Sequence, residues 1–345
     1  MKGRMIVLDH LGEVEASALL VEGKLHDILI DATDAPRPGA IYRAICDRPV
    51  KGQGGMMLRL PEGDSAFLRT AKGLAPGQAI LVQVTGYAED GKAVPVTQKV
   101  LFKSRYAIVT PGAPGLNISR TIKDEDTRDE LLAIAHSADL PDGYGLILRS
   151  SCVGADPVEI AEDIDAMAAL ADGVMAEADG KSAESLTEGE GPHALAWREW
   201  VEPAQVVTQV GGFEREGVLD QLAALTSAFH KLGEGGMYVE PTRALVAVDV
   251  NTGNDTSPAA ALKVNLAASR ALPLALRLRG LAGQITVDFA PMSKAHRKQI
   301  EQALRAAFRS DPIDTALVGW TPLGHFELQR KRERLPIAPV LAEVL

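Results

Sequence analysis

The chain has 345 residues, of which 46% are hydrophobic and 24% charged. This is enough for two or three domains and too apolar for a disordered protein. No apolar run approaches the roughly 18 residues that a membrane-spanning helix needs, and Asp9 and Glu13 near the start argue against a secretory signal. The two cysteines, Cys46 and Cys152, lack metal-ligand spacing, which argues against a cysteine-based zinc site or a disulfide framework. We therefore expect a cytoplasmic protein without a membrane span.

The net charge of −10 is distributed unevenly along the chain. Residues 151–200 contain two basic and twelve acidic residues, whereas residues 251–345 contain thirteen basic and eight acidic ones. Such asymmetry permits an anionic partner on one face of an acidic protein but does not require one.

Short strands are predicted through the first 110 residues. Apolar and polar residues alternate in three runs separated by glycine turns, which predicts an antiparallel sheet over residues 1–37. Residues 38–110 continue with short strands rich in glycine and proline, which fits a small barrel of the OB type; the clearest strands are 40–46, 55–60, 79–85 and 94–100.

A small α/β segment is predicted over residues 111–178. Helical periodicity at 124–137 begins at Asp124, a strand follows at 144–149, and a second helix spans about 157–178. Its expected buried stripe is Ile160, Ile164, Met167, Leu170 and Val174. Residues 179–192 are rich in Gly, Ser and Glu, so we expect residues 179–234 to be an acidic linker with a connecting helix.

The last segment, residues 235–345, has a different pattern. Nearly continuous apolar strands alternate with helices, in the order 244–250, 257–279, 283–289, 294–309 and 314–320. This order predicts an α/β sandwich with a partly parallel sheet.

Two aspartates end the first two of these buried strands. Asp249 and Asp288 are connected by one crossover helix, and neighbouring strands lie about 4.8 Å apart, so both carboxylates can reach one crevice. Two carboxylates, waters and a phosphate oxygen form a typical Mg²⁺ shell. Asn251, on the same side of the strand, can hold a substrate oxygen or a metal-bound water.

Structural interpretations of these residues remain open. An aspartate that ends a buried strand is often a turn or cap residue. The basic helix that carries Lys294, Arg297 and Lys298 contacts an anionic strand or is a solvated face. His296 and His325 are candidate general acids, but lone histidines are more often structural or solvent-facing. Glu327 is expected on a helix, in a salt bridge.

Several motifs resemble those of the RNase E/G endoribonuclease family. The main similarity covers about residues 235–335, in GGMYVEPTRALVAVDVNTGNDT, NLAASRALPLALRLRGLAGQITVDFAPM and TPLGHFELQRKRER, with weaker support from PGLNISRTI and GLILRSSCVG. The resemblance implies a DNase I-like catalytic domain at 235–345, an OB-fold RNA-binding barrel at 38–110, a 5′-sensor subdomain at 111–178 and a reduced RNase H-like part at 1–37.

The resemblance also implies an activity and a set of site residues. The activity is Mg²⁺-dependent hydrolysis of single-stranded, A/U-rich RNA in RNA processing or decay, with a preference for a 5′-monophosphate. The metal-binding aspartates of the family fall on Asp249 and Asp288, and its substrate-orienting asparagine falls on Asn251. Its 5′-phosphate arginine falls on Arg149, followed by Ser150. We expect further RNA contacts from Lys92, Phe67, Lys294, Arg297, Lys298 and Arg330.

The sequence departs from the family pattern at several positions. No Cys-x-x-Cys zinc link follows the catalytic segment, so we expect no zinc, and any oligomer would not be zinc-linked. Met56 and Met57 stand where a stacking aromatic is usual, Ala290-Pro291 replaces an acid, and Pro322 replaces an arginine.

Three functions remain in competition. The first is a Mg²⁺-dependent endoribonuclease, and the second is an RNA-binding protein of the same ancestry with reduced or lost catalysis. A metal phosphoesterase acting on small phosphates is the third, but it leaves the barrel and the basic helix unexplained.

Overall fold

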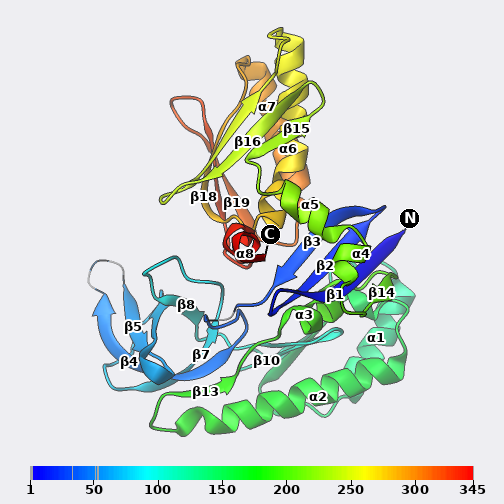
Figure 1. Cartoon of the computed structure of the whole chain (residues 1–345). Coiled ribbons are helices and arrows are strands. Elements are labelled where there is room, and N and C mark those ends of the chain that lie inside the picture. Colours follow the sequence, from blue (N-terminus) through cyan, green and yellow to red (C-terminus); the bar gives the residue numbers. More distant parts are fainter. Residues whose placement is uncertain (1–2, 33, 51, 53, 345) are drawn as a thin grey trace. The chain divides into compact units, whose positions relative to one another are not determined.

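The computed structural model describes residues 3–32, 34–50, 52 and 54–344, which form two compact units (Figure 1). Unit 1 comprises Met1–Thr33 and Pro203–Leu345, and unit 2 comprises Asp34–Glu202. The architecture is mixed α/β with one closed five-stranded barrel. Among the described residues, no helix is both long enough and apolar enough to cross a membrane.

The barrel of unit 2 is closed by pairing between its first strand and β7. Its strand order is β4-β5-β6-β8-β7, and β4 also pairs with β7. Alternate apolar side chains, among them Met56, Leu58 and Val82, fill the interior. The four predicted strands are confirmed, and β6 and the 3₁₀ turn η1 were not predicted; the bounds are β4 (Ile41–Val50), β5 (Gly55–Arg59), η1 (Pro61–Gly63), β6 (Ser65–Leu68), β7 (Ala79–Val84) and β8 (Val94–Thr97).

The segment predicted as a linker is part of the barrel sheet. Strand β13 (Glu184–Thr187) pairs with β4 and places Glu184 opposite Arg43. The Arg43 guanidinium is buried, donates to the Ser182 carbonyl at 2.8 Å and pairs with the Glu184 carboxylate. A buried guanidinium requires such acceptors, and an edge strand needs few apolar residues. The prediction of a linker at 179–192 is therefore wrong.

The rest of unit 2 is a second sheet, of order β11-β12-β10-β9, packed against two helices. Figure 1 shows the longer helix, α2, running the length of this part. Ile160, Ile164 and Val174 of α2 are buried as predicted, but Leu170 is 43% exposed. The bounds are β9 (Phe102–Lys103), β10 (Ala107–Pro111), β11 (Gly115–Ile118), α1 (Glu125–Ser137), β12 (Tyr144–Leu148), η2 (Ser150–Cys152), α2 (Pro157–Ala176), η3 (Glu177–Asp179) and α3 (Pro192–Glu199).

The N-terminal strands share a core with the C-terminal part of the chain. They form the predicted antiparallel sheet, which β14 extends by parallel pairing with β1. Phe213, Leu222, Leu278 and Leu341 pack against this sheet, so residues 1–32 belong with residues 203–344 rather than standing alone. The bounds are β1 (Arg4–Leu11), β2 (Val14–Val21), β3 (Lys24–Ile30), β14 (Gln205–Val207), α4 (Gly212–Arg215), α5 (Val218–Ala224) and α8 (Ile337–Val344).

A six-stranded sheet and two helices complete unit 1. The strand order is β15-β16-β17-β18-β20-β19. Only the central β17–β18 pair is parallel, because α6 connects these two strands. Strands β15, β16 and β20 were not predicted from the sequence, and Glu327 lies on strand β20 rather than on a helix. The bounds are β15 (Phe229–Leu232), β16 (Gly235–Pro241), β17 (Val246–Asn251), α6 (Pro258–Leu278), β18 (Gly283–Asp288), α7 (Lys294–Arg309), β19 (Thr315–Trp320) and β20 (Phe326–Arg330).

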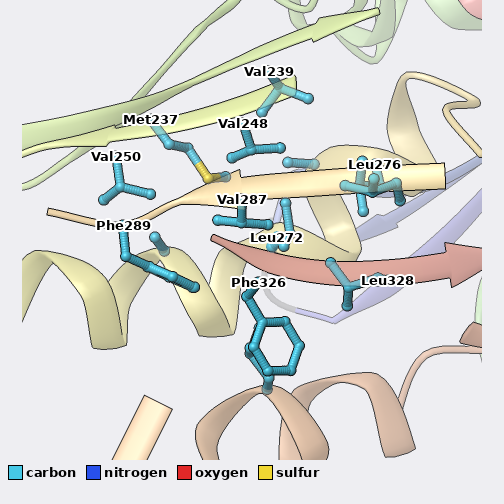
Figure 2. Packing of buried hydrophobic residues seen from close by; sticks show 14 of the residues in the cluster. Met237, Val239, Val248, Val250, Leu272, Leu276, Val287, Phe289, Phe326 and Leu328 are labelled. Atoms are coloured by element: carbon cyan, nitrogen blue, oxygen red, sulfur yellow. The ribbon is translucent and has the colours of Figure 1, made fainter. Parts of the chain in front are cut away.

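The core of this sheet lies on one face only. Figure 2 shows Met237, Val248, Val287 and Leu328 pointing towards apolar side chains such as Leu272. Alternate residues of each strand point the other way, because side chains in a strand alternate between faces. The second face therefore carries the polar residues of β16, β17, β18 and β20.

A buried ion network joins the N-terminal strands to this part of unit 1. The Asp311 side chain is fully buried, and its two oxygens lie 2.6 Å from Arg277 Nη1 and 2.7 Å from Arg330 Nη1. Arg277 also pairs with Asp27 on β3, at 3.5 Å, and donates to the His26 carbonyl at 2.8 Å. Each charge is compensated by a partner, as burial requires.

We predict that Asp311→Asn destabilises unit 1 by about 3–5 kcal/mol, because it leaves Arg277 and Arg330 buried without their carboxylate. The matched control is Asp314→Asn, since Asp314 makes an exposed ion pair with Lys331 and its loss should cost at most about 1 kcal/mol. Urea unfolding of the two variants measures both effects. Equal midpoints for the two would contradict the role of the network.

Candidate active site

The second face of the six-stranded sheet carries a row of side chains that crosses four strands and reaches the residue before a fifth. The pairing register places Phe229 opposite Tyr238, Tyr238 opposite Asp249, and Asp249 opposite Asp288. His325, just before β20, continues the row, with Nε2 3.9 Å from Asp288 Oδ2. We call these five residues the site row. Phe229, Tyr238, Asp249 and Asp288 are exposed, and His325 is half-buried.

Asp249 and Asp288 are the centre of the site row. They are direct partners in the parallel β17–β18 pair, so their side chains emerge side by side from one face, about 4.8 Å apart at the backbone. Asn251 Nδ2 donates to Asp249 Oδ2 at 2.6 Å. This bond orients the carboxylate and leaves Asn251 Oδ1 as the remaining acceptor of the amide.

The donor set suits a hard divalent cation. Two carboxylates and an amide oxygen are oxygen donors, the ligand type of Mg²⁺, which usually keeps several waters and substrate oxygens in its shell. In the part of the chain that the structure describes, no group of three or more His, Cys, Asp or Glu side chains is placed to hold a metal. The pair therefore fits a metal shared with a substrate phosphate better than a closed structural site.

His325 of the site row and Glu327 beside it were not among the site residues predicted from the sequence. His325 approaches Asp288, and Glu327 projects from β20 opposite Thr286, two residues before Asp288 on the same face. The sequence singled out both residues but gave no signal for their place beside Asp288, because that position depends on β20 lying beside β18.

The basic residues predicted to contact RNA separate into exposed and buried groups. Lys294 and Lys298 are exposed on α7, which begins just after β18 ends. Arg297 is half-buried, with its guanidinium carbon 4.8 Å from the centre of the Trp320 ring. Arg330 is 1% exposed, and its guanidinium is paired with the buried Asp311 carboxylate. The prediction that Arg330 contacts RNA is therefore wrong, because its side chain is buried inside unit 1.

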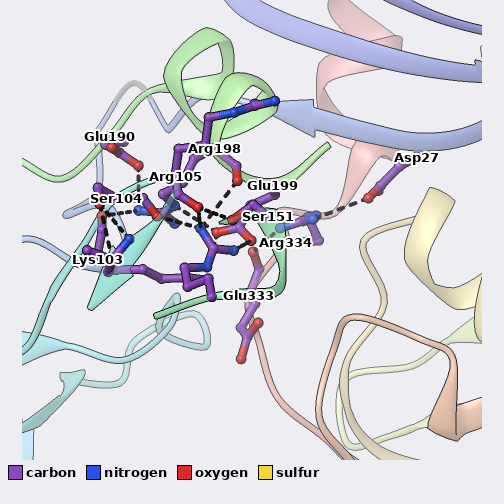
Figure 3. Close-up of polar contacts among 12 residues, drawn as sticks. Asp27, Lys103, Ser104, Arg105, Ser151, Glu190, Arg198, Glu199, Glu333 and Arg334 are labelled. Atoms are coloured by element: carbon purple, nitrogen blue, oxygen red, sulfur yellow. Dashed lines mark hydrogen bonds and ion pairs between the residues drawn. The ribbon is translucent and has the colours of Figure 1, made fainter. Parts of the chain in front are cut away.

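Arg149 of unit 2 lies in a cluster of four cations and two acids, Lys103, Arg105, Arg149, Arg198, Glu190 and Glu199. Figure 3 shows Lys103, Arg105, Glu190, Arg198 and Glu199 gathered together. Arg149 follows β12 and donates from Nη1 to the Ser104 carbonyl at 2.5 Å, and its Nη2 lies 2.7 Å from Glu199 Oε2. Ser150 begins the 3₁₀ turn η2 that follows. The predicted phosphate-binding arginine is thus engaged by a carboxylate of its own unit.

Glu199 is the acceptor at the centre of this cluster. Lys103 Nζ and Arg198 Nε both lie 2.7 Å from its Oε1. Burial by itself would raise the pKa of Glu199, but the charges of Lys103, Arg198 and Arg149 and the hydrogen bond from Lys103 outweigh it and lower the pKa to about 2.

The barrel residues lie at or near an open pocket of about 380 Å³ on unit 2. Lys92 lines it together with Met57, Asp64 and Val94, and the Lys92 ammonium pairs with Glu89. Phe67 is half-buried on β6, opposite Met57 of β5. The structure brings these barrel residues into one area of unit 2.

We predict that Glu199→Gln lowers the stability of unit 2 at neutral pH and flattens its acid dependence. Because the folded pKa of about 2 lies below the ordinary 4.5, the stabilisation by Glu199 is complete above about pH 4.5 and is lost as the pH falls towards 2. The difference in unfolding free energy between wild type and variant should therefore shrink across this window. Glu130→Gln, on the exposed surface of α1, is the control, and a pH-independent difference for Glu199→Gln would contradict the pKa assignment.

Comparison with known proteins identifies relatives along most of the chain. The Ribonuclease E/G family matches residues 102–205 and 198–333. A ribonuclease E of Nostoc sp. is 28% identical over 376 aligned positions, covering 92% of this chain and 54% of the relative. A ribonuclease G of Salmonella typhimurium is 26% identical, covering 77% of this chain and 62% of the relative.

These relatives are longer than the chain, which spans between about half and three fifths of their length. The family match nevertheless covers more than half of the 345 residues and includes both Asp249 and Asp288. The chain that carries the site row and the cation cluster therefore belongs to the Ribonuclease E/G family.

Proposed function

We propose that this protein is a Mg²⁺-dependent endoribonuclease that hydrolyses phosphodiester bonds of single-stranded RNA in RNA processing or decay. The observation that carries the proposal is the in-register pair Asp249 and Asp288 on the exposed face of the sheet. Relatives over most of the chain are named ribonucleases E and G, which supports RNA as the substrate.

Each residue of the centre has a role in this proposal. Asp249 and Asp288 hold the ion, and Asn251 fixes the orientation of the Asp249 carboxylate through its 2.6 Å hydrogen bond. When bound, the divalent ion supplies electrophilic assistance at the scissile phosphate. His325 borders Asp288 on the β20 side, with its Nε2 3.9 Å from the carboxylate. Hydrolysis leaves a 5′-phosphate and a 3′-hydroxyl.

Other parts of the molecule bind the RNA substrate in this proposal. Lys294 and Lys298 neutralise phosphates beside the centre, which makes the affinity fall as salt rises. We propose that the barrel is an OB-type RNA-binding domain that uses Lys92 and Phe67. We further propose that the sheet and helices around Arg149 and Ser150 are a 5′-sensor, that the six-stranded sheet is DNase I-like, and that the N-terminal sheet is a reduced RNase H-like part.

The two buried free cysteines suit a reducing compartment, so we place the activity in the cytoplasm.

One observation favours the second candidate, an RNA-binding protein with weakened catalysis. After Asp288 the chain turns through Ala290, whose N–H and carbonyl are both bonded to the buried Asn265 side chain. This turn offers no further carboxylate before Lys294, so the centre depends on two acids. The cleavage assay below distinguishes the two candidates.

We predict that Asp249→Asn or Asp288→Asn lowers the rate of RNA cleavage by at least about 10²–10³-fold, because each removes one charged oxygen ligand at the centre. RNA affinity should not weaken, since a negative charge is lost. The assay uses a 5′-monophosphorylated A/U-rich oligonucleotide with Mg²⁺ or with EDTA. Asp314→Asn, at an exposed carboxylate of the same unit, should cleave like wild type.

Two results would separate the candidate functions. Wild type that binds the oligonucleotide but does not cut it with Mg²⁺ supports the RNA-binding candidate. Full Mg²⁺-dependent cleavage by both aspartate variants would show that the centre lies elsewhere.

We predict that wild type cleaves a 5′-monophosphorylated oligonucleotide faster than the 5′-hydroxyl form, and that Ser150→Ala and Arg149→Lys lower this ratio. A bidentate arginine binds a terminal phosphate in a geometry that lysine cannot reproduce. The ratio is the proper measurement, because a loss of folded protein lowers both rates equally. An unchanged ratio in both variants would exclude these residues from 5′-end recognition.

A further inference from the structure

The site row ends in two exposed aromatic rings that the proposed chemistry does not use. Phe229 and Tyr238 are 40% and 41% exposed, and their ring centres lie 5.1 Å apart at a tilt of 51°. Across the described residues, only one other Phe, Tyr or Trp side chain, Trp197, is exposed to this degree. Two of the three most exposed aromatic side chains are therefore neighbours on the face that carries the acidic pair. We call Phe229 and Tyr238 the aromatic shelf.

The backbone beneath the aromatic shelf is shaped to hold it. The Phe229 ring lies over Gly236, where any Cβ would collide with the ring edge. Met237 and Val239, on either side of Tyr238, are fully buried and anchor β16 to the core. A ring that is fixed before binding loses little conformational freedom when a ligand stacks on it.

The distance from the aromatic shelf to the acidic pair matches a short stretch of RNA. Tyr238 is the direct cross-strand partner of Asp249, and Phe229 lies one strand further. At about 4.8 Å per strand, the shelf extends from about 5 to about 10 Å from Asp249. A polynucleotide that follows the site row therefore places a base on the shelf within about one or two nucleotides of the phosphate at the acidic pair.

The charge beside the aromatic shelf also suits a nucleic acid. Lys231 is exposed on β15, two residues after Phe229 and on the same face, opposite Gly236. An ammonium beside stacked rings is the combination that binds single strands, with the cation on the backbone and the ring under the base. An apolar protein partner would gain nothing from Lys231 or Asp249.

We propose that Phe229 and Tyr238 form a nucleobase-stacking site that holds one unpaired base of single-stranded RNA next to the phosphate bound at Asp249 and Asp288. This inference rests on the proposed function for the nature of the polymer. Every base has a flat aromatic face, so the site accepts any base but excludes a paired one. The aromatic shelf thereby selects single strands at the point of cleavage.

The test uses the full chain in EDTA, so that RNA binds without being cut. A/U-rich oligonucleotides each carry one 2-aminopurine, whose fluorescence is quenched by stacking, at successive positions. We expect quenching at one or two adjacent positions in wild type and in Tyr238→Phe. Tyr238→Leu, which keeps apolar bulk but has no ring, should abolish that quenching and weaken affinity by roughly 5- to 150-fold, the equivalent of about 1–3 kcal/mol.

Val318→Ala is the matched control, because Val318 is an exposed apolar residue at the far edge of the same sheet, and it should behave like wild type. Phe229→Leu, checked for folding by circular dichroism, gives a second variant of the aromatic shelf. If wild type binds RNA but Tyr238→Leu binds and quenches equally, the stacking site is refuted and the nuclease proposal stands. If wild type binds no RNA either in EDTA or with Mg²⁺, the proposed function is refuted and the stacking site with it.

Discussion

The parallel, in-register pairing of β17 with β18 is the constraint on which the candidate active site depends. Strand β18 ends at Asp288 and β17 carries Asp249 two residues before its end, and the register makes these two residues direct partners, so two carboxylates emerge side by side from one surface. Like charges this close repel one another, which makes the arrangement suited to a cation. A shift of one residue in either strand would turn its aspartate towards the apolar core. The helix α6 between the strands sets their direction and leaves their ends together.

The one-sided core of the six-stranded sheet makes the site row possible. Helices α6 and α7 bury one face with Val, Leu, Ile and Phe side chains, and the other face keeps Tyr238, Asp249, Asp288 and Glu327. Close packing on the covered face gives the polar face a rigid support, which preorganises the acidic pair. The buried network around Asp311 adds a polar anchor behind this sheet and joins it to the N-terminal strands.

The cation cluster of unit 2 differs from the acidic pair of unit 1 because it contains charges of both signs. The cations at Lys103, Arg149 and Arg198 are drawn together by Glu199, whose pKa they lower to about 2. A phosphate that binds Arg149 must compete with this carboxylate or share the guanidinium with it. The terminal phosphate, with its higher charge, is better able to do so than an internal phosphodiester. The proposed 5′-end preference therefore has a physical source in a cluster that is already neutralised in part.

The sequence by itself determined the elements that periodicity and chain order specify. Alternation of apolar and polar residues predicted the N-terminal strands, and short runs between glycine and proline predicted the barrel strands. The 3.6-residue period predicted α1, α2 and α7. The positions of Asp249 and Asp288 at the ends of two apolar runs predicted their meeting. Tertiary structure alone decided which residues of distant strands became neighbours. The burial of Arg330 against Asp311, the use of residues 184–187 as a barrel strand, and the placing of Phe229, Tyr238 and His325 in one row all follow from strand order and register. Those are properties of long-range pairing, which no local pattern of hydrophobicity or charge encodes.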